Sequence, residues 1–415
     1  MNKTSMFKNT WWALIVLLTL ATPLIGTIGA SLVIILSIVC LPFIIDREAF
    51  LELRKLPMIV MFSIGLIVFA FFTAITAKSA YDRWIIFAFM PFLSSATAYI
   101  LAKNYAKIHG GKKTAQIFLT LCLIGSGLTI LVAIADMTFV GSVRPRGFFS
   151  GVITLSMVGT TLGIVAGMGF FLVEGYKKLF FMLGPIFALV IIALTQSRGT
   201  AIALPSLAAL YFIYAIRRTK TFQAKVLVVL TLSILLALSY YFITQQSARI
   251  AGIFDIVNQV LDHGLSSIMG ANIRIEMYLA GWELFLAEPF FGYGWTNMSE
   301  MAFTVLDASK YDAHLIRYFH FHNDFLNFAF AIGVIGIVIY FSFLFAPIIG
   351  ALKSQKDKMF GFRLEIILLM TTLYFFSGLT GGTLSHGLLI TLYAMISAIV
   401  LGGFQGEQLK DKSKT

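Results

Sequence analysis

The stretch from Leu56 to Ala77 reads LPMIVMFSIGLIVFAFFTAITA and contains no charged residue. Its apolar residues do not alternate with polar ones, as they would in a half-buried strand. A helix of about 20 predominantly apolar residues is long enough to cross the hydrocarbon core of a bilayer. The run Val226–Ile243 has the same character. Both stretches therefore predict helices that span a membrane.

The composition of the whole chain supports the same fold class. The 415 residues are 59% hydrophobic and only 12% charged, whereas soluble proteins contain about 25% charged residues. A soluble domain of this composition would expose large apolar patches and aggregate. The only cysteines, Cys40 and Cys122, lie in apolar runs and indicate no disulfide framework. An ordinary cytoplasmic enzyme, a secreted disulfide scaffold and a disordered protein are excluded.

The hydropathy pattern predicts an all-α polytopic membrane protein with about twelve transmembrane helices. Pro23 and Gly26 indicate a tight break between the first two helices. A cleavable signal peptide ending near Ala30 is an alternative, disfavoured because apolar sequence continues directly past that residue. The expected spans cover residues 10–26, 27–45, 56–77, 84–102, 114–135, 150–173, 179–196, 200–216, 226–243, 323–348, 364–381 and 385–403.

The basic residues predict the orientation of the chain. With the N-terminus in the cytoplasm, 22 of the 31 lysines and arginines fall on the cytoplasmic side, and every short loop there is basic. This is the positive-inside bias of a multi-pass protein. The net charge of +12 therefore needs no nucleic-acid partner. Both termini are expected in the cytoplasm.

The spans divide the chain into four parts. Residues 1–243 and 323–403 form the membrane domain, residues 244–322 a large external loop, and residues 404–415 a cytoplasmic tail. The external loop carries eight of the 19 acidic residues and is the only soluble segment large enough to fold over the membrane. Chemistry is therefore expected on the non-cytoplasmic face.

No phosphate-binding GxxxxGK[ST] loop, HExxH motif or CxxC pair occurs, which argues against nucleotide-driven chemistry. An enzyme on the external face needs a substrate that is already activated, such as a lipid diphosphate. It then needs cations to hold the diphosphate and a base for the acceptor hydroxyl.

Two arginines are candidates for binding an anion. Arg198 lies in the sequence TQSRGT, in a short external turn between two apolar spans. The alternative for Arg198 is an interfacial anchor that reaches lipid headgroups. Arg274 lies on an expected amphipathic helix, residues 272–287, and shares a face with Tyr278 and Gly281, away from Glu276. The alternative for Arg274 is an ordinary solvated charge.

The sequence HFHND, residues 320–324, supplies a candidate base at the start of the tenth span. A histidine there can be neutral near pH 7 and accept a proton. On a regular helix, Gly333 lies below His322, and with Gly336 it would form a smooth face for close helix packing. One alternative is a histidine that only caps the helix. Another is a metal site formed by His320, His322 and Asp324.

Weaker candidates lie in two other external turns. Arg144 and Arg146, in the sequence RPRG, precede the sixth span and could join an anion-binding surface or be exposed turn charges. His386 lies in the last external turn and is interpreted as structural rather than catalytic.

These residues together resemble the bacterial O-antigen ligases, whose superfamily also contains O-antigen polymerases and bacterial O-linked oligosaccharyltransferases. The resemblance covers twelve spans, two cytoplasmic termini and one large periplasmic loop between spans nine and ten. Ile202 departs from the pattern, because the family often has leucine there. The matching motifs are His322-Asn323 followed at the family's spacing by Gly333 and Gly336, the preceding His320, Arg198, Arg274 and Arg146-Gly147.

The resemblance implies a GT-C-like glycosyltransferase in the bacterial inner membrane with a periplasmic active site. It implies metal-independent, inverting transfer of a glycan from undecaprenyl diphosphate to a sugar hydroxyl of the lipid A core oligosaccharide, without a cofactor. His322 would be catalytic and Arg198 and Arg274 would bind the diphosphate. Further substrate contacts would come from Arg146, His320 and Asn323.

Three other functions remain open from sequence. An O-antigen polymerase or a protein O-oligosaccharyltransferase would use the same lipid-linked donor. A transporter for anionic solutes is a more distant alternative, disfavoured because the charges gather at one face rather than near the middle of the spans.

Overall fold

The computed structural model describes residues 3–44, 46–76, 86, 89–218, 273–310, 319–353 and 357–406, with a few further residues between 222 and 237. Within these ranges the chain is predominantly helical and forms no strand. The all-α polytopic fold predicted from sequence is confirmed. Most of the ninth expected span, all of residues 244–272 and His314 lie outside the described residues.

Eight segments in the described part of the chain are long and apolar enough to cross a membrane. Two shorter apolar helices, Thr27–Pro42 and Gly387–Gly403, coincide with the expected second and twelfth spans. The larger helices are α1 (Lys3–Val16), α2 (Thr22–Ile25), α3 (Thr27–Ile44), α4 (Arg47–Leu53), α5 (Pro57–Thr76), α6 (Met90–His109), α7 (Gly111–Ala135), α8 (Val152–Gly167), α9 (Leu183–Thr195), α10 (Arg198–Ala201), α11 (Leu204–Arg218), α14 (Ile273–Ala287), α15 (Met298–Ala302), α17 (Asp324–Leu352), α18 (Phe360–Gly378) and α19 (Gly387–Gly403).

The break expected near the N-terminus is present. Pro23 lies in the first turn of α2, where its missing N–H costs nothing. Gly26 ends α2 with a positive φ of 57°, a conformation that favours glycine. A Cβ at Gly26 would also clash with the carbonyl group of Phe148 in the loop before α8. The break therefore brings the N-terminal helices close to that loop.

Burial distinguishes the helices at the centre of the bundle from those that face lipid. Every residue of α19 from Leu388 to Gly403 is buried, and α8 is buried almost as completely. In contrast, α5 exposes Ile64, Ile67, Phe71 and Ile75, each by 58 to 67%. These residues are three or four positions apart and therefore form one stripe along the helix. We infer that this stripe faces hydrocarbon.

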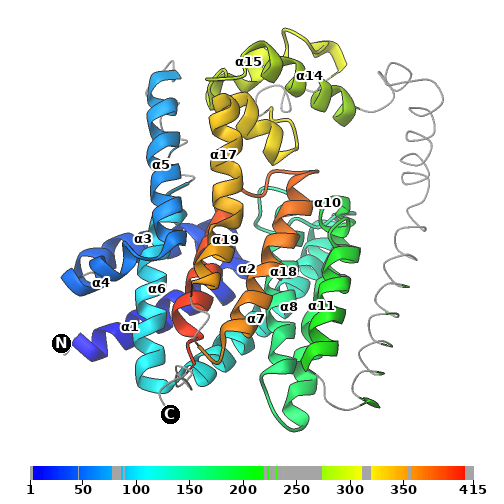
Figure 1. Ribbon diagram of the computed structural model, residues 1–415. Helices are drawn as coiled ribbons and strands as arrows, with labels where there is room; N and C mark the ends of the chain where they lie inside the picture. Colours follow the sequence, from blue (N-terminus) through cyan, green and yellow to red (C-terminus); the bar gives the residue numbers. More distant parts are fainter. Residues whose placement is uncertain are drawn as a thin grey trace.

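The packing between helices determines which ends meet. The helix α19 packs against α6, α8 against α7 and α9, and α17 against α5 and α18. Figure 1 shows α14 and α15 beyond one end of the bundle, close to the start of α17. The helix α10 lies toward the same end, whereas α18 starts at the opposite end. The segments that carry Arg198, Arg274 and His322 therefore share one end of the molecule.

The helix α17 is not the regular helix that the sequence pattern predicted. Ile332 and Gly333 have non-helical backbone angles, and Gly333 has a positive φ of 62°. A Cβ at Gly333 would clash with the carbonyl oxygen of Pro289, and one at Gly336 would clash with the carbonyl oxygen of Phe328. The expectation of a smooth glycine face below His322 is therefore wrong. These glycines instead permit a break in the helix.

The loop after α14 occupies this break and replaces the lost helical hydrogen bonds. Tyr293 and Gly294 donate their backbone N–H groups to the carbonyl oxygens of Phe330 and Ala331, at 2.9 and 3.0 Å. The N–H of Val334 donates to the carbonyl oxygen of Pro289 at 2.7 Å. Irregular backbone in a membrane protein needs such internal partners. The loop thereby attaches α14 firmly to α17.

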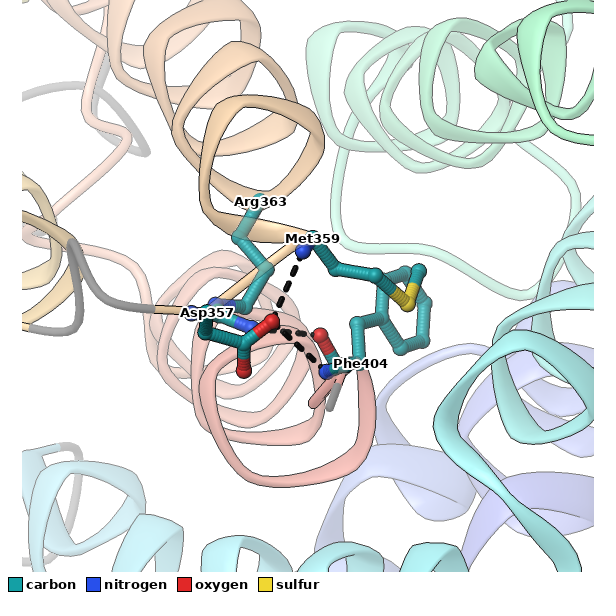
Figure 2. Close-up of polar contacts among 5 residues, drawn as sticks. Asp357, Met359, Arg363 and Phe404 are labelled. Carbon is teal, nitrogen blue, oxygen red and sulfur yellow. Dashed lines mark hydrogen bonds and ion pairs between the residues drawn. The ribbon is translucent and has the colours of Figure 1, made fainter. Parts of the chain in front are cut away.

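The opposite end of the bundle is held by a buried ion pair (Figure 2). The guanidinium of Arg363 is 1% exposed and donates to Asp357 at 2.8 Å and to the carbonyl oxygen of Phe404 at 2.6 Å. The Asp357 carboxylate also accepts the backbone N–H groups of Met359 and Gly406, each at 2.7 Å. Arg363, although counted among the cytoplasmic basic residues, therefore joins the start of α18 to the end of α19.

We expect Arg363→Met to lower the free energy of unfolding by about 3 kcal/mol, because the carboxylate of Asp357, which is only 14% exposed, would lose its charged partner. Thermal unfolding of the purified protein in detergent measures the change. Lys353→Met, which removes an exposed charge nearby, is the control and should change stability by less than about 0.5 kcal/mol. Equal stability of the two variants would contradict this account of the ion pair.

Candidate functional site

The turn between α18 and α19, residues 379–386, is held by the buried carboxylate of Asp324. The Oδ2 atom accepts hydrogen bonds from the backbone N–H and the hydroxyl of Thr383, at 2.8 and 2.6 Å, and from the N–H of Leu384 at 2.9 Å. The Oδ1 atom accepts from the hydroxyl of Ser385 at 2.7 Å. These bonds fix the turn against the start of α17.

The local sequence explains why the carboxylate can be buried at this point. Asn323 caps α17 by accepting from the N–H of Leu326 at 3.1 Å, and its amide donates to the carbonyl oxygen of Leu379 at 3.2 Å. Asp324 follows in the first helical turn, where the helix dipole favours a negative charge. A Cβ at Gly378 would lie 2.8 Å from Oδ2, so glycine leaves room for the carboxylate.

Arg274 reaches the same turn from α14. Its Nη1 atom donates to the carbonyl oxygen of Thr380 at 3.4 Å. One helical turn further along, the hydroxyl of Tyr278 lies 3.2 Å from the carbonyl oxygen of Leu379 and 3.3 Å from that of His322. Through Arg274 and Tyr278, one face of α14 therefore contacts both the α18–α19 turn and the backbone of His322.

The remaining contacts of α14 confirm the face predicted for Arg274. A Cβ at Gly281 would lie 3.0 Å from the ring of Phe321, so the absence of a side chain allows a close approach to the histidine segment. On the other side, Glu276 pairs with Lys310 at 3.2 Å. Arg274 therefore points toward the site while the acidic residue is engaged elsewhere.

His322 has an unusual backbone conformation, and the pKa of its side chain is strongly lowered. Its φ is 51°, a left-handed conformation that is uncommon for residues other than glycine and that is often found at functional sites. The ring centroids of His320 and His322 are 4.0 Å apart. Burial, with the charges of His320 and Arg274, lowers the pKa of His322 to about 3. The imidazole is therefore neutral at pH 7.

Arg198 lies at the start of α10 and is half-buried. The preceding turn is sharp, because Gln196 adopts a left-handed φ of 51° at the end of α9. A Cβ at Gly199 would lie 2.8 Å from the hydroxyl of Thr380. Gly199, next to Arg198, thus contacts Thr380, and the carbonyl oxygen of Thr380 accepts the hydrogen bond from Arg274.

The structure gives Arg144 and Arg146 different surroundings. Arg144 donates from Nε to the carbonyl oxygen of Thr195 at 3.2 Å and from Nη2 to that of Gln196 at 3.4 Å. A cation at the end of a helix is favourable, so Arg144 supports the turn that presents Arg198. Arg146 is exposed, and its backbone N–H donates to Asp136 at 2.7 Å. Its part in the site stays a prediction.

The α18–α19 turn is the part of the site that sequence reasoning did not find. From sequence, His386 is interpreted as structural and Asp324 is a candidate only as a metal ligand, and no other residue of the turn is a candidate. The turn joins Arg274, the Arg198 segment and Asn323 through contacts with Thr380 and Leu379. A signal was present in the sequence, because TGGTLSH is a small polar run between two apolar spans.

The arrangement of His320, His322 and Asp324 does not support a metal site. The carboxylate of Asp324 is directed at the α18–α19 turn, where its two oxygens accept four hydrogen bonds. Among the residues that the structure describes, no group of three His, Cys, Asp or Glu side chains is arranged to hold a metal ion. His320 and His322 therefore have no carboxylate partner in Asp324.

The fold and the site together define a polytopic helical membrane protein with arginine and histidine side chains gathered at one end. Residues 183–341 match a family model described as O-antigen ligase. This match supports assignment of the protein to the O-antigen ligase family, and it indicates a glycosyltransferase-like enzyme of the ligase or polymerase type. The matched residues include Arg198, Arg274 and His322. Among curated proteins, none matches the chain.

We expect Asp324→Asn to reduce glycan transfer at least tenfold. The amide nitrogen would face an N–H or a hydroxyl that now donates to the carboxylate, and leaving a buried donor unsatisfied costs about 1–3 kcal/mol. Transfer is measured with the purified protein in lipid nanodiscs. Ser385→Ala, which removes a single donor, is the comparison and should have the smaller effect. Wild-type activity in Asp324→Asn would contradict the importance of this carboxylate.

Proposed function

We propose that the protein is an O-antigen ligase of the bacterial inner membrane. In this proposal it transfers a glycan from undecaprenyl diphosphate to a sugar hydroxyl of the lipid A core, on the periplasmic face. The observation that carries the proposal is that α14, through Arg274 and Tyr278, contacts residues 379 and 380 and the backbone of His322, and that the Arg198 segment contacts the same turn. Cations for a diphosphate and an imidazole for a hydroxyl thus lie at one end of the bundle.

The charge pattern supports the periplasmic face. Arg217 and Arg218 end α11, whereas Arg198 precedes it at the other end. Basic residues follow the positive-inside bias, which assigns the end with Arg217 and Arg218 to the cytoplasm. Arg198 and Arg274 then lie on the side where lipid-linked glycans are the activated substrates available without nucleotides.

Arg198 and Arg274 are assigned to the diphosphate of the donor. A guanidinium binds phosphate oxygens through a planar set of donors and stays charged at all relevant pH values. During transfer the bond between the anomeric carbon and the phosphate oxygen breaks, and negative charge grows on the departing undecaprenyl diphosphate. Two cations already in position stabilise that charge more in the transition state than in the ground state.

His322 is assigned to the acceptor. The acceptor oxygen forms the new bond to the anomeric carbon from the side opposite the diphosphate, which inverts the configuration. The hydroxyl proton passes to His322, whose imidazole is neutral and can accept it. No metal ion and no nucleotide enter this sequence of steps.

Because the charge of Arg274 affects His322, the basicity of His322 should depend on whether the donor is bound. The positive charge of Arg274 is one cause of the low pKa of His322. A bound diphosphate would offset this charge, and an anion near an imidazole raises its pKa. His322 would therefore become a stronger base only after the donor has bound.

We expect Arg198→Ala, Arg274→Ala and His322→Ala each to reduce transfer by about 100-fold or more, as the loss of one transition-state contact typically does. Cells that express each variant in place of the wild type should lose the O-antigen ladder on lipopolysaccharide while the protein still inserts. Lys310→Ala and His109→Ala are the controls and should leave the ladder intact. Normal ladders in all three site variants would refute the assignment.

The same cells distinguish a ligase from a polymerase. Deletion of a ligase leaves long glycans on the carrier lipid, whereas deletion of a polymerase leaves single repeats attached to lipopolysaccharide. Long glycans on the carrier lipid are the expected outcome. Single repeats on lipopolysaccharide would instead indicate that the protein is a polymerase that uses the same site.

We expect His322 to stay neutral down to pH 5 in the protein without donor, because its pKa is about 3. With undecaprenyl diphosphate bound, its pKa should rise. Nuclear magnetic resonance of ring-labelled histidines in nanodiscs measures both values, and the spectrum of His322→Gln identifies the signal. Titration near the ordinary value of about 6.5 without donor, or no rise with donor, would contradict the proposed coupling.

A further inference from the structure

The second end of the α18–α19 turn carries a polar pair that the donor site does not use. His386 is the residue before α19, and its Nε2 atom lies 2.8 Å from the hydroxyl of Ser150 in the loop before α8. Ser150 is exposed and His386 is half-buried. A Cβ at Gly381 would lie 3.8 Å from the side chain of Ile153, so the two segments are also in contact beside the pair.

The position of this pair is fixed by the same carboxylate that fixes the donor end. Asp324 binds Thr383, Leu384 and Ser385, the three residues directly before His386. His386 therefore sits at a defined distance from the end of the turn where Thr380 binds Arg274. One end of this turn therefore contacts Arg274, whereas the other end carries the pair of His386 and Ser150.

The two ends differ in charge. Arg274 and the Arg198 segment contact Thr380 at the first end. At the second end, burial and the charge of His320 lower the pKa of His386 to about 4, so its imidazole is neutral at pH 7. Ser385, the residue before His386, donates to Asp324, which lies two residues after His322, so the His386 and His322 segments are adjacent.

The loop that contains Ser150 also contains two arginines, and each is held by contacts other than the Ser150–His386 pair. The guanidinium of Arg144 donates to the carbonyl oxygens at the end of α9. The backbone around Arg146 and Gly147 is held by Asp136. A hydroxyl and a neutral imidazole, in contrast, can each donate and accept a hydrogen bond. Such groups match the hydroxyls of a sugar better than a phosphate.

We propose that Ser150 and His386 form the subsite for the acceptor sugar, beside His322 and separate from the arginines that bind the donor diphosphate. This inference rests on the proposed function, because it needs a second, hydroxyl-bearing substrate. It adds no chemical step. The pair orients a sugar hydroxyl so that the neighbouring hydroxyl faces His322.

The test uses the full-length protein in nanodiscs with an undecaprenyl-diphosphate-linked glycan and rough lipopolysaccharide. Ser150→Ala and His386→Gln should raise KM for the lipopolysaccharide acceptor about three- to tenfold, as expected for loss of one neutral hydrogen bond. Binding of the lipid-linked donor, measured without acceptor, should stay within twofold of wild type. His109→Gln, the same substitution at the end of α6, is the control and should leave KM for the acceptor unchanged.

The outcomes separate this inference from the proposed function. An unchanged acceptor KM in both variants, or a loss that falls on donor binding, would overturn the subsite while leaving the ligase activity in place. If His386→Gln does not fold, Ser150→Ala alone decides, since it only shortens an exposed side chain. If the wild type elongates lipid-linked glycans instead, the same KM comparison applies to that sugar acceptor. Absence of both transfer reactions in the wild type would refute both proposals.

Discussion

The buried carboxylate of Asp324 is the interaction on which the end of the molecule that carries the candidate site depends. A carboxylate without partners in a protein interior is too costly to persist, so its position requires donors that surround it. The chain supplies these donors from residues 383–385, about 60 positions away in sequence. Because three consecutive residues are bound, the whole turn is fixed in orientation and not only in place. The contacts of Arg274, Asn323 and the Arg198 segment are then made with a turn that cannot rotate.

A second constraint comes from the backbone of α17. A break at Ile332 and Gly333 leaves carbonyl groups without helical partners, and lipid offers no replacement. The loop of residues 289–294 satisfies these groups through backbone hydrogen bonds. The helix α14 is thereby tied to α17 next to the His322 segment. The break thus gives α14 and the loop after it a fixed position relative to α17, which a continuous helix would not provide.

The parts of the fold that depend on local sequence could be predicted. The apolar run of α5, the break at Gly26 and the face of α14 that carries Arg274 follow from hydropathy, glycine and helical periodicity. The role of Gly333 could not, because its positive φ is stabilised by a loop that lies some 40 residues earlier. Likewise, the sequence places Asp324 beside His322 but does not reveal which distant residues donate to it. Periodicity describes one helix at a time, whereas the site arises from contacts between segments.

The separation of charge along the α18–α19 turn has a physical consequence for a two-substrate reaction. A diphosphate is attracted to cations over several ångströms, whereas a sugar hydroxyl gains only short, directional hydrogen bonds. If both kinds of group shared one pocket, the diphosphate would compete for every donor within it. With Arg274 at one end of the turn and His386 at the other, each proposed substrate would meet groups of its own kind. On the proposed assignment His322 would lie between the two regions, and its neutral imidazole could take a proton without competing for the phosphate. The geometry of one turn can thus keep the donor and the acceptor apart while bringing both to one imidazole.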